Sequence, residues 1–145
     1  GHPQGRWIDL GSGGGSPAIP LKIVRPQLRL TMVEARERKA AFLREAARQL
    51  AMDGVDVLNE RFELLSARHP ELGGRHLLVT VRAVRIDMAL LQSCRWLLAP
   101  GGRLLLFGAQ DAPGFEDAGF EASGRFDLSL GGSRLLVLTV GSDTA

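Results

Sequence analysis

The sequence predicts an α/β fold whose sheet is mostly parallel. Short apolar runs with the composition of strands alternate with longer segments of helical periodicity, and this alternation is typical of a parallel sheet covered by helices. The runs are short and apolar, as expected where both faces of a sheet are buried. Five such runs are expected to form strands: Trp7 to Leu10, Leu28 to Val33, Val55 to Leu58, His76 to Val81 and Arg103 to Phe107.

The longer segments between these runs are expected to be helices. A glycine-rich stretch precedes the first helix, for which Ser16 is the predicted N-cap and Pro17 the first residue. Arg61 to Gly74 is expected to hold one short helix and a loop. Between Arg36 and Ala51, the apolar side chains expected on one face are Phe42, Leu43, Ala46, Ala47 and Leu50. Between Ile86 and Leu98 the stripe comprises Ile86, Leu90, Leu91, Cys94, Leu97 and Leu98, and Ala99-Pro100-Gly101-Gly102 predicts a stop and a turn.

The C-terminal part of the sequence departs from this alternation. Two strand-like runs, Arg125 to Leu130 and Arg134 to Val140, are joined by Gly131-Gly132-Ser133, which predicts a hairpin. An antiparallel hairpin at the end of an otherwise parallel sheet is typical of class I methyltransferases and not of dehydrogenases. The predicted fold class is therefore α/β, a Rossmann-like class I methyltransferase fold with a mostly parallel seven-stranded sheet and a C-terminal antiparallel hairpin.

Composition and charge limit the classes of protein that fit. The 145 residues correspond to one domain, expected to span residues 1–145, and the net charge of +2 allows an RNA partner. No apolar run approaches the roughly 20 residues that cross a bilayer and no signal peptide opens the sequence, so we expect a cytoplasmic protein without a membrane partner. Cys94 lies in an apolar helical pattern and is expected to be a core thiol. His2, His69 and His76 lack ligand spacing, so no metal site is expected.

The strongest motif is a glycine-rich loop, Asp9-Leu10-Gly11-Ser12-Gly13-Gly14-Gly15, between the first predicted strand and a helix. Glycine permits a positive φ and the close approach of a ligand to the backbone. A helix start adds free amides and the positive end of a dipole, which suit a carboxylate as well as a pyrophosphate. We therefore expect Asp9, Gly11, Gly13 and Gly15 in a cofactor site, although a plain strand-to-helix turn would also explain the glycines.

An acidic residue supports the cofactor interpretation. Glu34 ends the second predicted strand, about 20 residues beyond the loop, where Rossmann-like folds place the acid that accepts hydrogen bonds from two ribose hydroxyls. Dinucleotide enzymes usually have an apolar residue where this chain has Asp9, whereas an acid followed by G-x-G-G-G is the first motif of S-adenosylmethionine enzymes. Asp9 can order the loop or reach the cofactor's amino group. The absence of a Lys-Ser/Thr ending excludes a Walker-type phosphate loop.

Over nearly its whole length the chain resembles the bacterial RsmG (GidB) family of guanine-N7 rRNA methyltransferases. The family carries a run like DVGSGxGxPGIPL, and this chain reads DLGSGGGSPAIPL. The family's later motifs are matched by Glu34-Ala35-Arg36, Arg61-Phe62-Glu63 and Val81-Arg82-Ala83. The run RFDLSLGGSRLLVLTV looks like the family's closing strands.

The resemblance implies which residues would hold S-adenosylmethionine. Gly11 and Ser16 would line the methionine end of the cofactor pocket. Glu34, Ala35 and Arg36 would hold the ribose.

The remaining implied roles concern the adenine and the substrate. Phe62 and Glu63 would contact the adenine, largely through backbone groups, although ordinary core packing of Phe62 is as strong an expectation. Arg82 would face both cofactor and substrate and is the candidate catalytic residue. A plain surface arginine at a strand end is the alternative for Arg82.

The chain departs from the family pattern in several places. The family's fifth strand usually ends in Lys-Gly, whereas this chain has Phe107-Gly108; Ser16 replaces a bulky apolar residue and Ala18 replaces a glycine. Family members also carry a helical segment of several dozen residues before the glycine loop, and we expect this chain to be either a short relative or a shortened form of one. These departures concern RNA recognition and full activity more than cofactor binding.

The function implied by the resemblance is methyl transfer from S-adenosylmethionine to N7 of a guanine in small-subunit ribosomal RNA. The expected partner is ribosomal RNA or the small ribosomal subunit, and the expected state is a monomer. N7 carries an in-plane lone pair and no proton, so its attack needs no general base. The sequence lacks an Asn-Pro-Pro-aromatic tetrad after the fourth strand, and its one cysteine lies in a helix, which argues against adenine amino-group and cytosine C5 methylation. Two alternatives stay open: a methyltransferase for another substrate, and a catalytically silent module that binds the cofactor together with RNA or a protein.

Overall fold

One sheet of seven strands, in the order β3-β2-β1-β4-β5-β7-β6, runs through the computed structural model, which describes residues 5–82, 85–109, 112–128 and 133–141. β1 to β5 pair in parallel, and β7 is antiparallel to both β5 and β6. The predicted mostly parallel sheet with an antiparallel C-terminal hairpin is confirmed. The strands are β1 (Arg6–Leu10), β2 (Arg29–Val33), β3 (Val55–Leu58), β4 (His76–Arg82), β5 (Leu98–Phe107), β6 (Phe120–Leu128) and β7 (Ser133–Val140).

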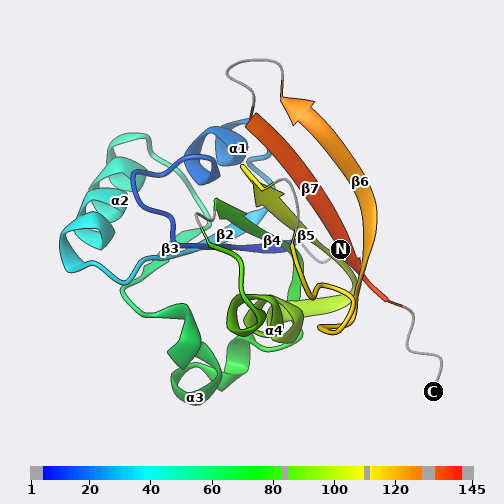
Figure 1. Ribbon diagram of the computed structural model, residues 1–145. Coiled ribbons are helices and arrows are strands. Elements are labelled where there is room, and N and C mark those ends of the chain that lie inside the picture. Colours follow the sequence, from blue (N-terminus) through cyan, green and yellow to red (C-terminus); the bar gives the residue numbers. More distant parts are fainter. Residues whose placement is uncertain (1–4, 83–84, 110–111, 129–132, 142–145) are drawn as a thin grey trace.

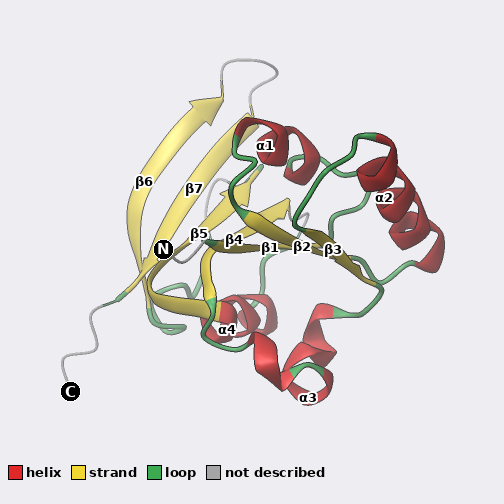
Figure 2. Ribbon diagram, turned by 180° about the vertical axis from the view of Figure 1, so that it is seen from behind, coloured by secondary structure: helices red, strands yellow, loops and turns green. Residues whose placement is uncertain are grey.

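Helices cover both faces of the sheet (Figures 1 and 2). One face carries α1 (Ala18–Val24) and α2 (Glu37–Gln49), and the other carries α3 (Leu65–Arg68) and α4 (Met88–Leu97). Two 3-10 turns, η1 (Phe62–Leu64) and η2 (Pro70–Leu72), flank α3. A small apolar cluster lies between the sheet and the first pair of helices, and a larger one lies on the α4 side. The small cluster comprises Trp7, Ala18, Leu30, Met32 and Leu43.

The buried stripe of α2 differs from the predicted one. Ala40 and Leu43 are buried, whereas Phe42 and Leu50 are 55% and 52% exposed. Residues 42, 46 and 50 form a second stripe beside the one through 40 and 43, and the helix lays only the latter against the sheet. Periodicity alone could not distinguish two adjacent apolar stripes, so the prediction that Phe42 and Leu50 belong to the packed face was wrong.

The start of α1 also differs from the prediction. The helix begins at Ala18, its N-cap position is Pro17, and no side chain of the described residues caps its first turn. Ser16 therefore lies one residue too early to act as the cap, because capping needs the hydroxyl on the flanking residue itself. Its hydroxyl instead accepts a hydrogen bond from Arg82 at 3.3 Å.

The last strands are longer than predicted at their starts. β5 begins at Leu98, so the turn predicted at 99–102 lies inside this strand. The pairing with β4 is irregular there, because β5 advances five residues from Leu98 to Arg103 while β4 advances two from His76 to Leu78. β6 begins at Phe120 and not at Arg125. Cross-strand pairing extends these strands where local composition indicates a turn. Gly131 and Gly132 of the predicted hairpin turn lie outside the described residues, and Ser133 begins β7.

The helix α4 supports the sequence interpretation of Cys94. Asp87 caps this helix by accepting a hydrogen bond from the amide of Leu90 at 2.9 Å. Cys94 is fully buried, and burial raises the pKa of its thiol. The prediction of a core thiol is confirmed. Among the described helices, none is long and apolar enough to cross a membrane.

Candidate functional site

The carboxyl ends of the parallel strands meet at one edge of the sheet, where the predicted site residues gather. β1 pairs with β2 on one side and with β4 on the other, so the chain order changes direction between β1 and β4. In open α/β sheets, ligands bind outside the carboxyl ends of strands at such a switch point. The glycine loop leaves β1 at this position (Figure 1).

A buried chain of hydrogen bonds fixes the start of the glycine loop. The indole nitrogen of Trp7 donates to Thr80 Oγ1 at 2.8 Å, and the Thr80 hydroxyl in turn donates to Asp9 Oδ1. Ser12 Oγ donates to Asp9 Oδ2 at 2.6 Å. Asp9 is 1% exposed, and burial raises the pKa of its carboxyl to about 6 against the lowering effect of the two hydroxyls. With both oxygens engaged inside the protein, the Asp9 side chain orders the loop.

The backbone of the loop is held against β2 and leaves room beside it. The amides of Gly11 and Ser12 both donate to the carbonyl of Val33, at 2.9 and 3.1 Å. Gly11 and Gly13 have positive φ values of 68° and 53°, which explains the need for glycine there. Apart from the glycine itself and its two chain neighbours, no heavy atom of the described residues lies within 4 Å of the position that a Cβ of Gly11 or Gly14 would take. A ligand can therefore approach this backbone closely.

Glu34 joins the loop to the end of β2. Its Oε1 accepts a hydrogen bond from the amide of Gly13 at 2.9 Å, and its Oε2 accepts one from the amide of Arg36 at 2.7 Å. The side chain is 7% exposed. A carboxylate has about four acceptor positions, so each oxygen keeps one for a ligand. The predicted partners Gly13, Glu34 and Arg36 thus lie together.

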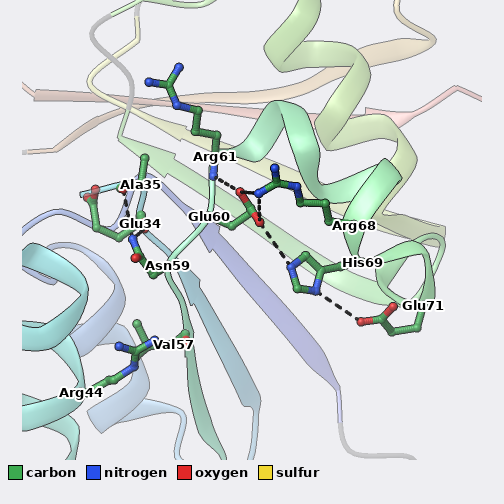
Figure 3. Close-up of polar contacts among 10 residues, drawn as sticks. All are labelled: Glu34, Ala35, Arg44, Val57, Asn59, Glu60, Arg61, Arg68, His69 and Glu71. Carbon is green, nitrogen blue, oxygen red and sulfur yellow. Dashed lines mark hydrogen bonds and ion pairs between the residues drawn. The ribbon is translucent and has the colours of Figure 1, made fainter. Parts of the chain in front are cut away.

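Asn59, which the sequence did not single out, holds the segment that carries Glu34 (Figure 3). Its Nδ2 donates to the carbonyls of Glu34 and Ala35, at 3.0 Å each. The amide of Glu60 also donates to the Glu34 carbonyl at 3.1 Å, and the Glu34 amide donates to the carbonyl of Leu58 at 2.9 Å. An asparagine after a strand was the only sequence signal for this contact, and such residues are common in loops.

Phe62 and Glu63 lie farther along, in η1, and line a hollow against α4 with Ala89 and Trp96. The Phe62 ring packs against the larger apolar cluster, as ordinary core packing predicts. No hydrogen bond joins Phe62 or Glu63 to Glu34 or the glycine loop in the described part of the chain. The groups next to Glu34 come instead from the two residues that directly follow β3.

Charged side chains from the segment after β3, the end of α3 and η2 form a small surface cluster (Figure 3). Glu60 lies 3.3 Å from Arg68 and 3.7 Å from His69, whose other ring nitrogen lies 3.6 Å from Glu71. His76 is buried, its Nδ1 lies 2.9 Å from the carbonyl of Leu97, and burial lowers its pKa. Both described histidines thus have structural surroundings, and the described residues contain no group suited to a metal ion.

Arg82 ends β4 and reaches the far end of the glycine loop. Its Nη1 donates to Ser16 Oγ at 3.3 Å, and the side chain is exposed. Phe107, at the position where the family pattern has lysine, ends β5 beside it. The structure therefore brings together two predicted residues, Arg82 and Ser16, that are 66 positions apart in the sequence. Ala83, the last residue of the same motif, lies outside the described residues.

Residues 2–116 match the rRNA small subunit methyltransferase G (GidB) family. The chain is 40% identical over 131 residues to the ribosomal RNA small subunit methyltransferase G of Deinococcus radiodurans, which covers 86% of this chain and 49% of that protein. It is 56% identical over 64 residues to that of Paracoccus denitrificans, covering 44% of this chain and 33% of that protein. The chain thus spans between a third and a half of the length of these relatives.

Solved structures share the fold at low sequence identity. A SAM dependent methyltransferase from Aquifex aeolicus superposes with a TM-score of 0.74 at 15% identity, covering 94% of this chain and 82% of that one. The antibiotic-resistance methyltransferase Kmr gives a TM-score of 0.71 at 20% identity, covering 93% of this chain and 86% of that one. These likenesses establish the fold, and the sequence match establishes the family: the chain belongs to the rRNA small subunit methyltransferase G family.

Proposed function

We propose that this chain is the cofactor-binding domain of an S-adenosylmethionine-dependent methyltransferase that acts on N7 of a guanine in small-subunit ribosomal RNA. The observation that carries the proposal is the hydrogen bond between Glu34 and the amide of Gly13, because it joins the two parts of the sequence motif into one site. Residues 1–145 would form one domain, and the protein would work as a monomer in the cytoplasm.

The residues at the carboxyl edge fit this cofactor. Open space beside Gly11 and Gly14 admits a ligand to the loop backbone. The amides of Gly14 and Ser16 donate no hydrogen bond within the described residues, so they are available to the carboxylate of the amino-acid end. The two unused acceptor positions of Glu34 suit two ribose hydroxyls.

The remaining roles follow the family pattern. Gly11 and Ser16 would line the amino-acid end of the pocket, while Ala35 and Arg36 would offer backbone groups to the ribose. Phe62 and Glu63 would complete the adenine side. In this assignment the loops after β1 and β2 would hold the amino-acid and ribose parts of the cofactor, and the segment after β3 would contact its adenine.

The reaction itself asks little proton chemistry of the protein. When bound, the cofactor would supply a sulfonium methyl group, and N7 would accept it through its own lone pair, without loss of a proton. The chain's contribution is therefore orientation, and well-oriented reactions reach effective molarities of roughly 10⁵–10⁸ M. Arg82, exposed and next to Ser16, is suited to position the base or a flanking phosphate.

A second candidate function is a catalytically silent module that binds the cofactor together with RNA or a protein. It is favoured by Phe107 at the end of β5, where the family pattern has lysine, because the carboxyl edge of the sheet then lacks that positive charge. Methyl transfer to another substrate stays a further alternative, since one fold serves many reactions.

Cofactor and acceptor are tested separately. Calorimetry should show saturable binding of S-adenosylmethionine and S-adenosylhomocysteine, and tighter binding of NAD with neither detectable would overturn the proposal. Small subunits from a strain that lacks the modification should then gain a methyl group at guanine N7 from a form that carries the family's preceding helical segment, and little from residues 1–145 alone, as detected by mass spectrometry of the rRNA. Arg82→Ala should lower transfer at least about tenfold with cofactor affinity retained, and Arg82→Lys should restore little because a planar fork differs from a point charge. Exposed Arg85→Ala is the matched control.

A further inference from the structure

A hollow of about 260 Å³ lies where the ends of β4 and β5 meet the segment before α1. Ser16, the residue directly after the glycine loop, is one of the residues that line this hollow. The volume is below the roughly 300–1,000 Å³ of sites that hold whole drug-sized ligands, so it suits one planar group. Its lining residues come from four parts of the chain and are Ser16, Pro17, Arg82, Phe107, Gly108 and Leu128.

Strand pairing sets Arg82 and Phe107 side by side. They are the last partners in the parallel register of β4 and β5, so their side chains project from the same face of the sheet. Their preceding neighbours, Val81 and Leu106, are buried in the apolar cluster on the α4 side. Arg82 and Phe107 therefore project toward the opposite face, where α1 and the glycine loop lie.

The lining chemistry is that of a nucleobase site. Phe107 offers a half-buried aromatic ring, Leu128 is 37% exposed, and Arg82 offers guanidinium donors beside the Ser16 hydroxyl. Aromatic and guanidinium planes are the groups on which unstacked bases stack. None of the described residues that line the hollow is acidic, so they offer no counter-charge to an amine or another cation.

We propose that this hollow holds the acceptor base, a purine with a carbonyl oxygen at C6, with Phe107 as its stacking surface and Arg82 as the donor to that oxygen. The inference rests on the proposed function, because it places the base beside the cofactor's methyl end. A single hydrogen bond to O6 leaves the lone pair of N7 free for the methyl group. Adenine carries an amino donor at the same position and would be disfavoured by Arg82. Phe107 would thus supply the stacking surface at the position of the family's lysine, and Arg82 would determine the preference for guanine.

The test uses the full chain, saturated with S-adenosylhomocysteine and labelled with ¹³C in its phenylalanines. Guanosine 5′-monophosphate should shift the NMR signal of Phe107, assigned through Phe107→Leu, and should bind more tightly than adenosine 5′-monophosphate. Phe107→Leu keeps apolar bulk but loses the flat ring, and should weaken guanosine monophosphate binding about 5- to 150-fold, the range of base–aromatic stacking. Phe107→Tyr should retain binding. Arg82→Ala should remove the preference for the guanine nucleotide.

The matched control is Phe126→Leu, because Phe126 is an exposed aromatic residue that lines a different hollow on β6. It should leave nucleotide affinity unchanged, and a loss equal to that of Phe107→Leu would overturn the proposal. An equal loss of S-adenosylhomocysteine affinity in Phe107→Leu would assign the hollow to the cofactor and also overturn it. If S-adenosylhomocysteine binds but guanosine 5′-monophosphate does not shift the Phe107 signal, only the base site is overturned. If the unaltered chain fails to bind S-adenosylhomocysteine, the proposed function is overturned.

Discussion

The carboxylate of Glu34 accepts a hydrogen bond from the backbone amide of Gly13 at 2.9 Å. This contact joins the end of β2 to the middle of the glycine loop, so the acid and the loop form one unit. A change at either residue should therefore affect both ends of a bound cofactor.

Replacing Glu34 tests this unit directly. Glu34→Ala removes the acceptor for the Gly13 and Arg36 amides and for the proposed ribose hydroxyls. We expect S-adenosylhomocysteine binding to weaken by about 1–3 kcal/mol, measured by calorimetry, because the buried donors lose their partner. Glu37→Gln, on the exposed first turn of α2, is the control and should bind normally. A folded Glu34→Ala variant with unchanged affinity would refute the role.

Asn59 should act on cofactor binding through Glu34. Asn59→Asp places acceptor oxygens against the Glu34 and Ala35 carbonyls, and Asn59→Ala removes the two donated hydrogen bonds. We expect calorimetry to show a loss of about 0.5–1.5 kcal/mol in the free energy of cofactor binding for Asn59→Ala, and more for Asn59→Asp.

A double-mutant cycle separates this positioning role from a general one. Asn59→Ala should cost little in a Glu34→Ala background, because the side chain that it positions is already gone. Glu60→Gln changes the neighbouring side chain but keeps the backbone donor to Glu34, and should not alter affinity. Additive losses in the cycle would contradict the positioning role.

Thr80 should be needed for folding stability. Thr80→Val keeps the shape of a fully buried residue but leaves the Trp7 indole nitrogen without its acceptor and Asp9 Oδ1 without its donor. We expect the free energy of unfolding to fall by about 1–3 kcal/mol in urea denaturation. Thr80→Ser retains the hydroxyl and should recover most of the loss; equal destabilisation by serine and valine would point to packing alone.

Asp9 should make stability depend on pH in a defined window. Burial raises its folded-state pKa to about 6 from an ordinary value of 3.8, so the folded protein binds this proton more tightly than the unfolded chain. The contribution to the free energy of unfolding is then largest below about pH 4 and falls as pH rises to about 6, by at most about 1.4 kcal/mol per pH unit. Denaturation at several pH values should show this fall in the difference between the unaltered chain and Asp9→Asn. A difference that stays flat from pH 4 to 7 would contradict it.

Patterns of neighbouring residues in the sequence predicted the first four strands closely. Strand-like runs and helical periodicity marked β3 at its observed bounds and β1, β2 and β4 to within a residue. The buried stripe of α2 and the starts of β5 and β6 could not be predicted, because they depend on which surface each element packs or pairs with. Phe42 illustrates the difference, since an apolar side chain on an amphipathic helix remains 55% exposed.

The sequence by itself determined the glycine loop, the acid at Glu34 and the alternation that gives a parallel sheet, because backbone freedom, charge and periodicity are properties of residues close together in the chain. Only the tertiary structure decided that Thr80 meets Asp9 and that Phe107 lies beside Arg82. Those contacts depend on β4 pairing between β1 and β5, which brings together residues that are remote in the sequence. Strand order is set by the packing of the whole sheet, and no local pattern records it.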